Sequence, residues 1–579
     1  MYILGISAFY HDSAACIIKD GELIACASEE RFTRKKGDFN FPINAMNFCL
    51  KYANITTDDL DYVGFYDKPS LKFDRILHTY LSSFPRSFPT FVKVIPMWIK
   101  EKLLIKKLIC DKLDIDPDKV LFAEHHLSHA ASTFLVSPFE KSAILTVDGV
   151  GEWATTTYGI GEKNKIQILK QINFPDSLGL LYSAFTYYLG FKINSSEYKV
   201  MGLAPYGQPK YLNQMSEIID IREDGSFKLN LKYFAYHYGL KMTNGKFDEL
   251  FGGPPRVPET KIEQRHFDLA ATIQKVTEIA MLKMANYLYE KTRLENLCLA
   301  GGVALNCVAN GKILRETPFK NIFIQPAAGD AGGAIGIAYF IYNALLKNAR
   351  NFVMTRADYG PEFTDNEIQK YLDSQDAIYE KCERNELLQK VAKLVDEQNV
   401  VGWFQGRMEF GPRALGNRSI LGDARNPKMK DILNLKIKFR ETFRPFAPSV
   451  VEDKYQEYFD INIPSPFMLL VAPVRENKRV VPSITHIDGS ARLQTVSRET
   501  NPLYYDLIKE FERRTSCPVI INTSYNVRGE PIVCTPEDGY RCFIRTRMDY
   551  LAMGSFLLDK KKQRNVVEDE SWKKIFPPD

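Results

Sequence analysis

Three of the eight histidines in this chain fall within five positions, in the stretch Leu-Phe-Ala-Glu-His-His-Leu-Ser-His-Ala at residues 121–130. In a helix, His125 and His129 would lie on one face, and His126 and His129, three apart, would lie nearly as close. Two imidazoles on one helical face are a common start of a metal site. A solvated helix that carries polar residues by chance is the alternative. The spacing leaves the choice between the two histidine pairs open.

Two aspartates stand among glycines just after short apolar runs. Asp148 ends one run and precedes Gly149 and Gly151, and Asp330 lies in Ala-Gly-Asp-Ala-Gly-Gly. Glycine lets the backbone approach a ligand and turn its N–H groups toward an anion. Both aspartates are therefore candidate ligands of a metal or neighbours of a phosphate, with a simple Asp-Gly turn as the alternative. A third glycine turn, at residues 300–306, follows a predicted strand and suits an anion at a helix start.

The second half of the chain contains a cation-rich stretch. Residues 407–444 carry six arginines and four lysines against four acids. Arg413 lies in Gly-Pro-Arg-Ala-Leu-Gly and Arg444 in Phe-Arg-Pro, and such fixed arginines suit a bidentate grip on phosphate or carboxylate. A solvated helix face and a nucleic-acid surface are the alternatives. Because RNA- and DNA-binding motifs do not surround these arginines, we favour a small phosphorylated ligand. A predicted strand at 519–521 leads into a further polar cluster, residues 522–526.

The whole-chain composition bounds the class of protein. A length of 579 residues predicts at least two domains, and 45% hydrophobic with 25% charged residues is typical of a globular protein. A net charge of +5 does not by itself indicate a nucleic-acid partner. The ten cysteines include no C-x-x-C pair, so we expect free thiols in a reducing compartment. Without a signal-like N-terminus or a run of 18 apolar residues, we predict a cytoplasmic protein with no membrane span.

The elements that would position these residues are strands and helices in alternation. Apolar runs at 2–7, 14–18 and 23–27 predict three strands, and an Asp-Gly turn joins the last two into a hairpin. A polar stretch at 345–365 marks a domain boundary. The chain is therefore expected to be an α/β protein of two domains, residues 1–355 and 356–579.

The segment 71–110 is basic and aromatic. We predict an amphipathic helix pair packed on its own domain. A membrane-surface or partner-binding insertion is the alternative, and we assign the segment no function.

Eight motifs follow one another along the chain: F-Y-H-D-S-A-A, E-E-R-F-T-R-K-K, E-H-H-L-S-H-A, V-D-G-V-G-E, A-G-G-V-A-L-N, A-G-D-A-G-G-A, G-P-R-A-L-G-N-R-S and F-R-P-F-A-P. Together they resemble the O-carbamoyltransferases that decorate nodulation factors, antibiotics and related natural products. The resemblance implies an N-terminal actin/sugar-kinase-like domain, a duplicated ribonuclease-H-like fold similar to the tRNA threonylcarbamoyl transferase and the hydrogenase-maturation carbamoyltransferase. It also implies a C-terminal α/β domain like the threonylcarbamoyl-adenylate synthase.

The resemblance also implies site residues. A metal, Fe(II) or another divalent ion, would be held by His125, His129, Asp148 and Asp330, which favours the i, i+4 histidine pair. His11 and Lys36 match catalytic positions of the transfer site. The phosphate or adenylate loops of the transfer domain would be Gly149, Gly151, Gly301, Gly302, Asn306 and Gly329. The site for ATP and carbamoyl phosphate would comprise Arg413, Lys438, Arg444, Met468, Arg492, Asn522, Ser524 and Arg528.

The function implied is ATP-dependent O-carbamoyl transfer. Carbamoyl phosphate and ATP would give carbamoyl-adenylate in the C-terminal domain, with Mg as a further candidate cofactor. A hydroxyl of a small-molecule acceptor, a natural product or a sugar, would then take the carbamoyl group at the metal site. Both co-substrates are polyanions, which agrees with the fixed arginines. We expect no nucleic-acid partner, and a homodimer is one candidate for the oligomeric state.

Other functions fit the sequence less well. A metalloprotease of the H-E-x-x-H type needs a glutamate where His126 stands. A sugar kinase leaves the arginine-rich half unused. The enzyme alternative is a threonylcarbamoyl-type tRNA modification enzyme, which should be more basic than +5. The non-enzyme alternative is a nucleotide-binding regulatory protein without turnover.

Overall fold

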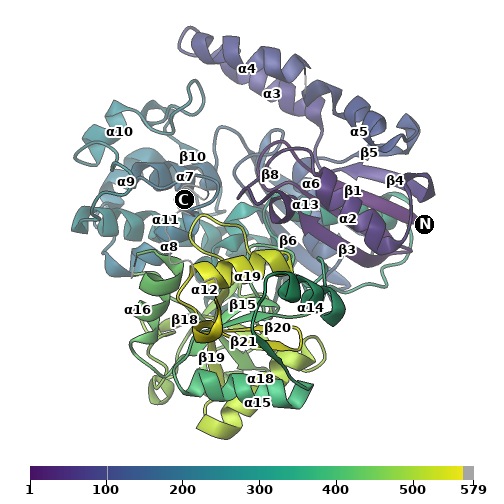
Figure 1. Cartoon of the computed structure of the whole chain (residues 1–579). Helices are drawn as coiled ribbons and strands as arrows, with labels where there is room; N and C mark the ends of the chain where they lie inside the picture. The colour runs from purple at the N-terminus through teal and green to yellow at the C-terminus, as the bar shows by residue number, and fades with distance from the viewer. Residues whose placement is uncertain (101, 442, 565–579) are drawn as a thin grey trace. The chain divides into compact units, whose positions relative to one another are not determined.

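The computed structural model describes residues 1–100, 102–441 and 443–564 of the chain (Figure 1). It divides into two units. The first comprises Met1–Glu29 and Gly37–Met354, and the second comprises Glu30–Lys36 and Thr355–Asp579. The division after Met354 lies beside the boundary predicted at 355/356, but the prediction had placed Glu30–Lys36 in the first domain. Residues 565–579, which end the second predicted domain, lie outside the described residues.

The first unit contains two five-stranded sheets with the same strand order, β3-β2-β1-β4-β5 and β8-β7-β6-β11-β12. In each sheet the first strand in sequence lies at the centre, pairing antiparallel with the second and parallel with the fourth. This repeated topology confirms the predicted duplicated ribonuclease-H-like fold. The strands are β1 (Tyr2–Ser7), β2 (Ala14–Lys19), β3 (Glu22–Ser28), β4 (Leu60–Phe65), β5 (Val120–Phe122), β6 (Lys141–Val147), β7 (Ala154–Glu162), β8 (Lys165–Asn173), β11 (Asn296–Ala300) and β12 (Asn321–Ile324).

The histidine-bearing helix of this unit is held by close packing. Helix α6 (His125–Phe134) contacts α13 (Gly332–Tyr339), which also packs on β1. At Gly336 an added Cβ would lie 1.9 Å from the carbonyl oxygen of Ser128, so only glycine permits the approach of the two helices. Further helices of the unit are α2 (Ile43–Ala53), α7 (Leu178–Tyr188), α8 (Glu197–Leu203), α9 (Leu212–Ile218), α10 (Gly245–Leu250), α11 (Gln264–Thr292) and α12 (Cys307–Glu316).

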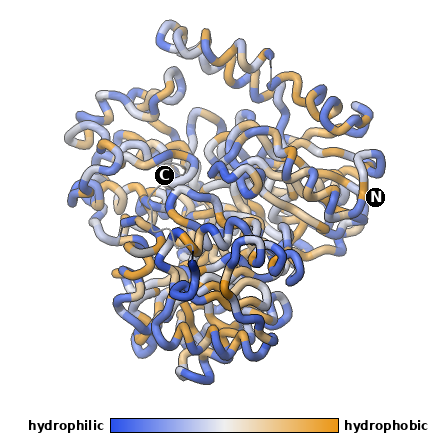
Figure 2. Tube along the Cα trace, viewed as in Figure 1, coloured by the Kyte–Doolittle hydropathy of each residue, from blue (hydrophilic) through white to orange (hydrophobic). Residues whose placement is uncertain are grey.

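The segment 71–110 is helical, but it contains three helices and not the predicted pair: α3 (Pro69–Ser82), α4 (Phe88–Lys100) and α5 (Ile105–Leu113). Ile95 and Trp98 face inward, whereas Phe88 and Ile99 are more than half exposed. The hydropathy along α3 and α4 accordingly alternates between hydrophobic and hydrophilic residues (Figure 2). In the described part of the chain, no helix combines the length and the apolar character that crossing a bilayer requires.

The second unit is also α/β and is organised around a nine-stranded sheet of order β13-β21-β20-β14-β15-β19-β16-β18-β17. Helices α15 (Arg384–Asp396) and α18 (Pro502–Thr515) share a core with Trp403, Leu421 and Ile520 of the central strands. The strands are β13 (Tyr379–Lys381), β14 (Val401–Phe404), β15 (Arg418–Asp423), β16 (Ala447–Val451), β17 (Leu470–Pro473), β18 (Ser490–Val496), β19 (Val519–Ser524), β20 (Tyr550–Met553) and β21 (Phe556–Asp559), and further helices are α14 (Asp365–Ser374), α16 (Met429–Leu433), α17 (Tyr455–Tyr458) and α19 (Pro536–Arg545).

The short N-terminal segment of the second unit, which includes α1 (Glu30–Thr33), is fixed by an arginine. The Arg34 guanidinium donates to the carbonyl oxygen of Ile532 at 2.7 Å and to the Glu530 carboxylate at 3.1 Å. It also lies 3.2 Å from the Asp538 carboxylate. The second unit is therefore assembled from two stretches of chain more than 300 residues apart.

Candidate metal centre and nucleotide site

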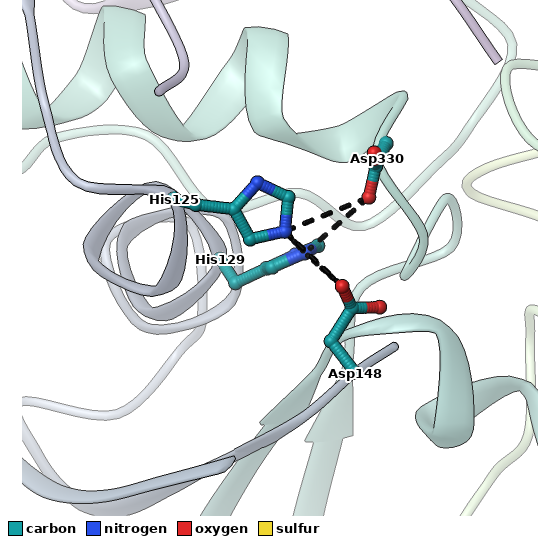
Figure 3. Close-up of side chains that lie close together, drawn as sticks. All are labelled: His125, His129, Asp148 and Asp330. Carbon is teal, nitrogen blue, oxygen red and sulfur yellow. Dashed lines mark hydrogen bonds and ion pairs between the residues drawn. The ribbon is translucent and has the colours of Figure 1, made fainter. Parts of the chain in front are cut away.

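The two histidines of the predicted pair lie close together because both belong to helix α6, which begins at His125. The helix places His129 one turn later, and the two Nε2 atoms lie 3.0 Å apart (Figure 3). Both backbone and ring of His125 are held: its N–H donates to the Glu152 carboxylate at 3.0 Å, and its ring is buried. His126 turns elsewhere, with its Nδ1 2.6 Å from the Thr146 hydroxyl. The i, i+4 pair is thus the one that faces the two aspartates.

Asp148 reaches the histidines from the end of β6. Its Oδ2 lies 3.1 Å from Nε2 of His125, while its Oδ1 accepts a hydrogen bond of 2.7 Å from the Gly302 N–H. Gly301 makes that turn possible, with φ at +91° and no room for a Cβ, which would lie 2.3 Å from the Val147 carbonyl oxygen. The glycine turn at residues 300–306 therefore uses the Gly302 N–H to orient an acidic side chain, so that this N–H is not available to a phosphate.

Asp330 reaches the same point from the loop after β12. Its Oδ1 lies 3.6 Å from Nε2 of His125 and 3.8 Å from Nε2 of His129. Its Oδ2 accepts a hydrogen bond of 3.2 Å from the Tyr66 hydroxyl. Oδ1 is buried and has no hydrogen-bond partner among the described residues. Each aspartate thus presents one oxygen to the histidines and has the other anchored by the protein.

These four donor atoms have the spacing of a metal shell. They all lie within 4.8 Å of one another, and the four residues are buried. Donors ~2.1 Å from one ion stand roughly 3.0 Å apart at right angles and roughly 4.2 Å apart when opposite. The distances between histidine nitrogens and aspartate oxygens, from 3.1 to 4.0 Å, fall in that range. Two imidazoles and two carboxylates therefore fit a divalent cation.

The charge state of the cluster suits the same ligand. Burial lowers the pKa of His125 well below its usual value and lowers that of His129, so both rings are neutral and can offer lone pairs. Burial, with the neighbouring charge of Asp148, raises the pKa of Asp330 to about 7. Burial alone would also raise the pKa of Asp148, but the hydrogen bond from His125 and the nearby imidazoles hold it well below its usual value. A cation between these side chains would stabilise both carboxylates.

His11 borders the cluster, as the resemblance implies. Its Nε2 lies 3.9 Å from Oδ2 of Asp330, and its Nδ1 lies 3.0 Å from the Asp12 carboxylate. Burial opposes protonation of this ring, but Asp330 and Asp12 outweigh it and raise the pKa to about 10. Lys36, the other predicted catalytic residue, belongs to the second unit, so its role at the transfer site stays a prediction.

The predicted loop residues of the first unit differ in how much space surrounds them. A Cβ at Gly329 would meet nothing within 4 Å, and one at Gly149 would approach only the Tyr10 hydroxyl and Leu180 at about 4 Å. At Gly151 it would lie 3.0 Å from the Cβ of His125. The Asn306 side chain caps α12, accepting from the Ala309 N–H at 3.1 Å, and pairs with Gln274. Phosphate binding by these loops stays a prediction.

The sequence reasoning missed two side chains that support the cluster, Tyr66 and Glu152. Tyr66 follows β4 and anchors Asp330, and Glu152 accepts the N–H groups of His125 and Lys68. Glu152 stands in the quoted V-D-G-V-G-E motif, so a signal was present. Tyr66 has no comparable signal, because the strand pairing that brings it near Asp330 is not local.

In the second unit, one face of strand β19 changes from apolar to polar along its length. Ile520, Asn522 and Ser524 alternate onto the same face of β19, and only Ile520 belongs to the core beneath α15 and α18. Asn522 donates to the Gln494 amide oxygen at 2.9 Å and to the Ala414 carbonyl at 3.2 Å. The loop that carries Arg413 therefore adjoins β19. Arg492, two residues before Gln494 on β18, shares its face.

The cations of this polar face are concentrated near its end. Lys438 is buried, and its Nζ donates to the side-chain oxygen of Asn526 at 2.8 Å and to the backbone oxygen of Ser524. Burial, together with Arg440 and Arg444, holds the pKa of Lys438 well below its usual value.

One acid links two further predicted arginines. Glu441 lies 3.6 Å from the Arg444 guanidinium and 3.7 Å from that of Arg528. Met468 is buried two residues before β17 and has φ at +56°. Contacts thus connect Lys438, Asn522 and Ser524 around β19, and Glu441 connects Arg444 with Arg528. Binding of ATP and carbamoyl phosphate by these residues, with Arg413, Arg492 and Met468, stays a prediction.

Two family profiles match the chain. The carbamoyltransferase N-terminus matches residues 2–339, and the carbamoyltransferase C-terminus matches residues 392–560. The chain belongs to the carbamoyltransferase family. It is therefore a transferase enzyme, and carbamoyl transfer is the activity of its family.

Known relatives cover nearly the full length. An uncharacterised Synechocystis protein, sll1178, is 52% identical over 100% of this chain and 100% of its own length. Nodulation protein NolNO of Sinorhizobium fredii is 36% identical, over 99% of this carbamoyltransferase and 82% of NolNO. Among solved structures, HypF of T. kodakarensis is 14% identical, with a TM-score of 0.31, over 60% of this chain and 48% of HypF.

Proposed function

We propose that this carbamoyltransferase uses ATP and carbamoyl phosphate to make carbamoyl-adenylate in its second unit, and transfers the carbamoyl group to a small-molecule hydroxyl in its first. The observation that carries the proposal is the convergence of two neutral histidines and two anchored aspartates in a chain of this family. The cation-rich face of the second unit supplies the separate site that two polyanionic co-substrates need.

The proposed adenylation balances with one water. Water cleaves carbamoyl phosphate to carbamate and phosphate, and a carbamate oxygen then attacks the α-phosphorus of ATP, so that pyrophosphate leaves. Arg413 and Arg444 are the candidates to bind phosphoryl oxygens. Lys438 adds a buried amine at the polar end of β19, which a bound phosphoryl group would keep protonated. Asn522, Ser524, Arg492 and Arg528 supply further donors on the same side. Mg²⁺ bound to ATP is a further candidate.

In the proposed transfer, the acceptor oxygen bonds to the carbamoyl carbon, the bond from that carbon to the AMP oxygen breaks, and AMP leaves. His125, His129, Asp148 and Asp330 would hold Fe(II) or another divalent ion, which when bound would supply Lewis acidity to a carbonyl oxygen. His11 is oriented by Asp12 and faces the cluster. Because its raised pKa keeps the ring protonated at neutral pH, it is the candidate to donate a hydrogen bond to the reacting oxygen, and it could accept the hydroxyl proton only once a bound cation lowers that pKa. Lys36 is proposed as a stabiliser of developing charge.

The acceptor is proposed to be a natural product or a sugar and not a nucleic acid, since the net charge of +5 is small for 579 residues. A cytoplasmic location, and a homodimer as the assembly, complete the proposal.

Phosphorus NMR of the purified, metal-loaded protein with ATP and carbamoyl phosphate tests this function. We expect pyrophosphate and phosphate to accumulate together. If pyrophosphate forms only when threonine and bicarbonate replace carbamoyl phosphate, the chain is instead a threonylcarbamoyl-type enzyme. If ATP binds but neither mixture reacts in the presence of hydroxyl acceptors, the alternative of a nucleotide-binding regulatory protein gains support.

A further inference from the structure

Arg75, on α3 in the first unit, carries a buried positive charge that has no ion-pair partner in the described part of the chain. The residue is only 7% exposed. Its guanidinium lies over the Phe174 ring, 4.9 Å from the centroid, and its buried Nε has no hydrogen-bond partner. No hydrogen bond or ion pair of the guanidinium exists among the described residues 1–100, 102–441 and 443–564. A buried cation without a partner costs free energy unless an anion pairs with it.

Arg350, in the same unit, shows what a structural arginine looks like here. Its guanidinium donates hydrogen bonds of 2.8 to 3.2 Å to five backbone carbonyl oxygens, those of Phe134, Leu135, Ser137, Phe139 and Lys163. Carbonyl oxygens are abundant in any fold, so a purely structural role would have given Arg75 similar partners. The contrast indicates that the partner of Arg75 does not lie among the residues that the structure describes.

Arg75 lies close enough to Tyr10 and Glu152, two neighbours of the metal cluster, for their charges to act on it. Lys72, one turn earlier on α3, forms a buried ion pair of 2.7 Å with Asp67, and its Nζ is 5.4 Å from the Tyr10 ring. Burial and the charges of Asp330 and Asp148 raise the pKa of the Tyr10 hydroxyl, and the charge of Arg75 opposes that rise. Lys72 and Arg75, on the same α3 helix, therefore both lie near Tyr10, the neighbour of the proposed reaction site.

The acids near Arg75 are already engaged. Asp67 is paired with Lys72, and the Glu152 carboxylate accepts the backbone N–H groups of His125 and Lys68. Glu152 is also partly neutralised, because burial and the charge of Asp67 raise its pKa to about 7. Burial lowers the pKa of Arg75 to about 10, which still leaves it charged at neutral pH. A net positive charge therefore remains for a ligand.

We propose that Arg75 forms an oxyanion subsite of the transfer site, which binds a phosphate or carboxylate group of the molecule that reacts at the cluster. The identity of that molecule rests on the proposed function, whereas the anion-binding role of Arg75 does not. The two sources are the adenylate phosphate and an acidic group on the acceptor. Tyr10 is partly exposed, and its hydroxyl is subject to the charges of Arg75 and of both aspartates, so it is the candidate neighbour of the subsite.

Isothermal titration with AMP and with inorganic phosphate tests the subsite in four proteins: wild type, Arg75→Gln, Arg350→Gln and Arg413→Ala. We expect Arg75→Gln to weaken at least one titrant by about tenfold or more, the effect of losing a charge-assisted hydrogen bond. If AMP binds more weakly to the variant, the anion that Arg75 binds is the adenylate phosphate. If inorganic phosphate binds more weakly and AMP binding is unchanged, the anion is an acidic group on the acceptor. Arg413→Ala reports on the proposed adenylation site separately, so failure there leaves the subsite intact.

Thermal unfolding without ligand supplies the second measurement. Arg75→Gln should unfold at the same or a higher temperature than wild type, since a buried cation without a partner is removed. Arg350→Gln should unfold at a lower temperature, with unchanged binding of both titrants. Unchanged affinity of Arg75→Gln for both AMP and phosphate would overturn the proposal, and so would a loss of stability as large as that of Arg350→Gln.

Discussion

At the scale of single residues, the cluster depends on each aspartate presenting one oxygen while the protein holds the other. Asp148→Asn keeps the shape and the hydrogen bond from Gly302 but removes the charge. We expect it to lose bound divalent metal, and with it the stabilisation that metal provides, which is about 2.7 kcal/mol when free metal is 100 times its Kd. Elemental analysis after gel filtration, with unfolding scans with and without metal, measures both effects.

His126→Asn is the control for that substitution. His126 is as buried as the predicted ligands, but its ring pairs with Thr146 and does not face the aspartates. The variant should lose some stability and keep its metal. Wild-type metal content in Asp148→Asn, or loss of metal only in His126→Asn, would contradict the assignment of the four ligands.

Spacing and motif predicted the four converging residues but not their supports. The i, i+4 rule and the glycine-flanked aspartates are local signals, so His125, His129, Asp148 and Asp330 could be named from the sequence. Tyr66 and Arg75 could not, because their roles depend on which strand and helix lie beside the cluster. The choice of His125 over His126 as the partner of His129 came from the resemblance and agrees with the direction in which the rings point.

At the scale of elements, the turn after β11 positions Asp148 through Gly301 and Gly302. Gly301→Ala would force a Cβ to within 2.3 Å of the Val147 carbonyl oxygen at a φ of +91°. We expect a loss of roughly 1–3 kcal/mol in the free energy of unfolding, the range for backbone strain, and weaker metal binding as the Gly302 N–H moves. Denaturant unfolding and metal titration measure the two effects.

Gly329→Ala is the matched control, because its Cβ would meet nothing within 4 Å although the residue adjoins Asp330. It should change the free energy of unfolding by less than about 1 kcal/mol. Equal effects of the two substitutions would show that the Gly301 turn does not position Asp148.

Strand runs and hairpin turns were readable from the sequence, whereas sheet order was not. The Asp20-Gly21 hairpin joins β2 and β3 as the turn rule predicts. The parallel pairing of β11 with β6, in contrast, joins residues about 150 positions apart. The position of Glu30–Lys36 in the second unit rests on bonds between residues almost 500 positions apart, such as Arg34 to Ile532. A local pattern carries no information on such pairs.

At the scale of the whole molecule, the second unit needs the segment Glu30–Lys36, because Arg34 in that segment pairs with two acids of the unit. Arg34→Ala leaves Glu530 and Asp538 largely buried without their cation. We expect the second unit to lose about 3 kcal/mol of stability, as for a broken buried pair. Hydrogen exchange resolved by peptide would locate the loss to residues 355–564. Lys35→Ala, at an exposed neighbouring position, should have no such effect, and a loss confined to the first unit would contradict the assembly.

The two halves of the reaction are proposed to belong to different units, and the rate of pyrophosphate release in two variants tests this division. With ATP, carbamoyl phosphate and metal-loaded protein, the rate should fall by about 100-fold or more in Arg413→Ala, as expected when a fixed cation on a phosphoryl group is lost. In His125→Ala, which lacks a metal ligand, the rate should stay near that of wild type. Equal loss in both variants, or loss only in His125→Ala, would contradict this division of the chemistry.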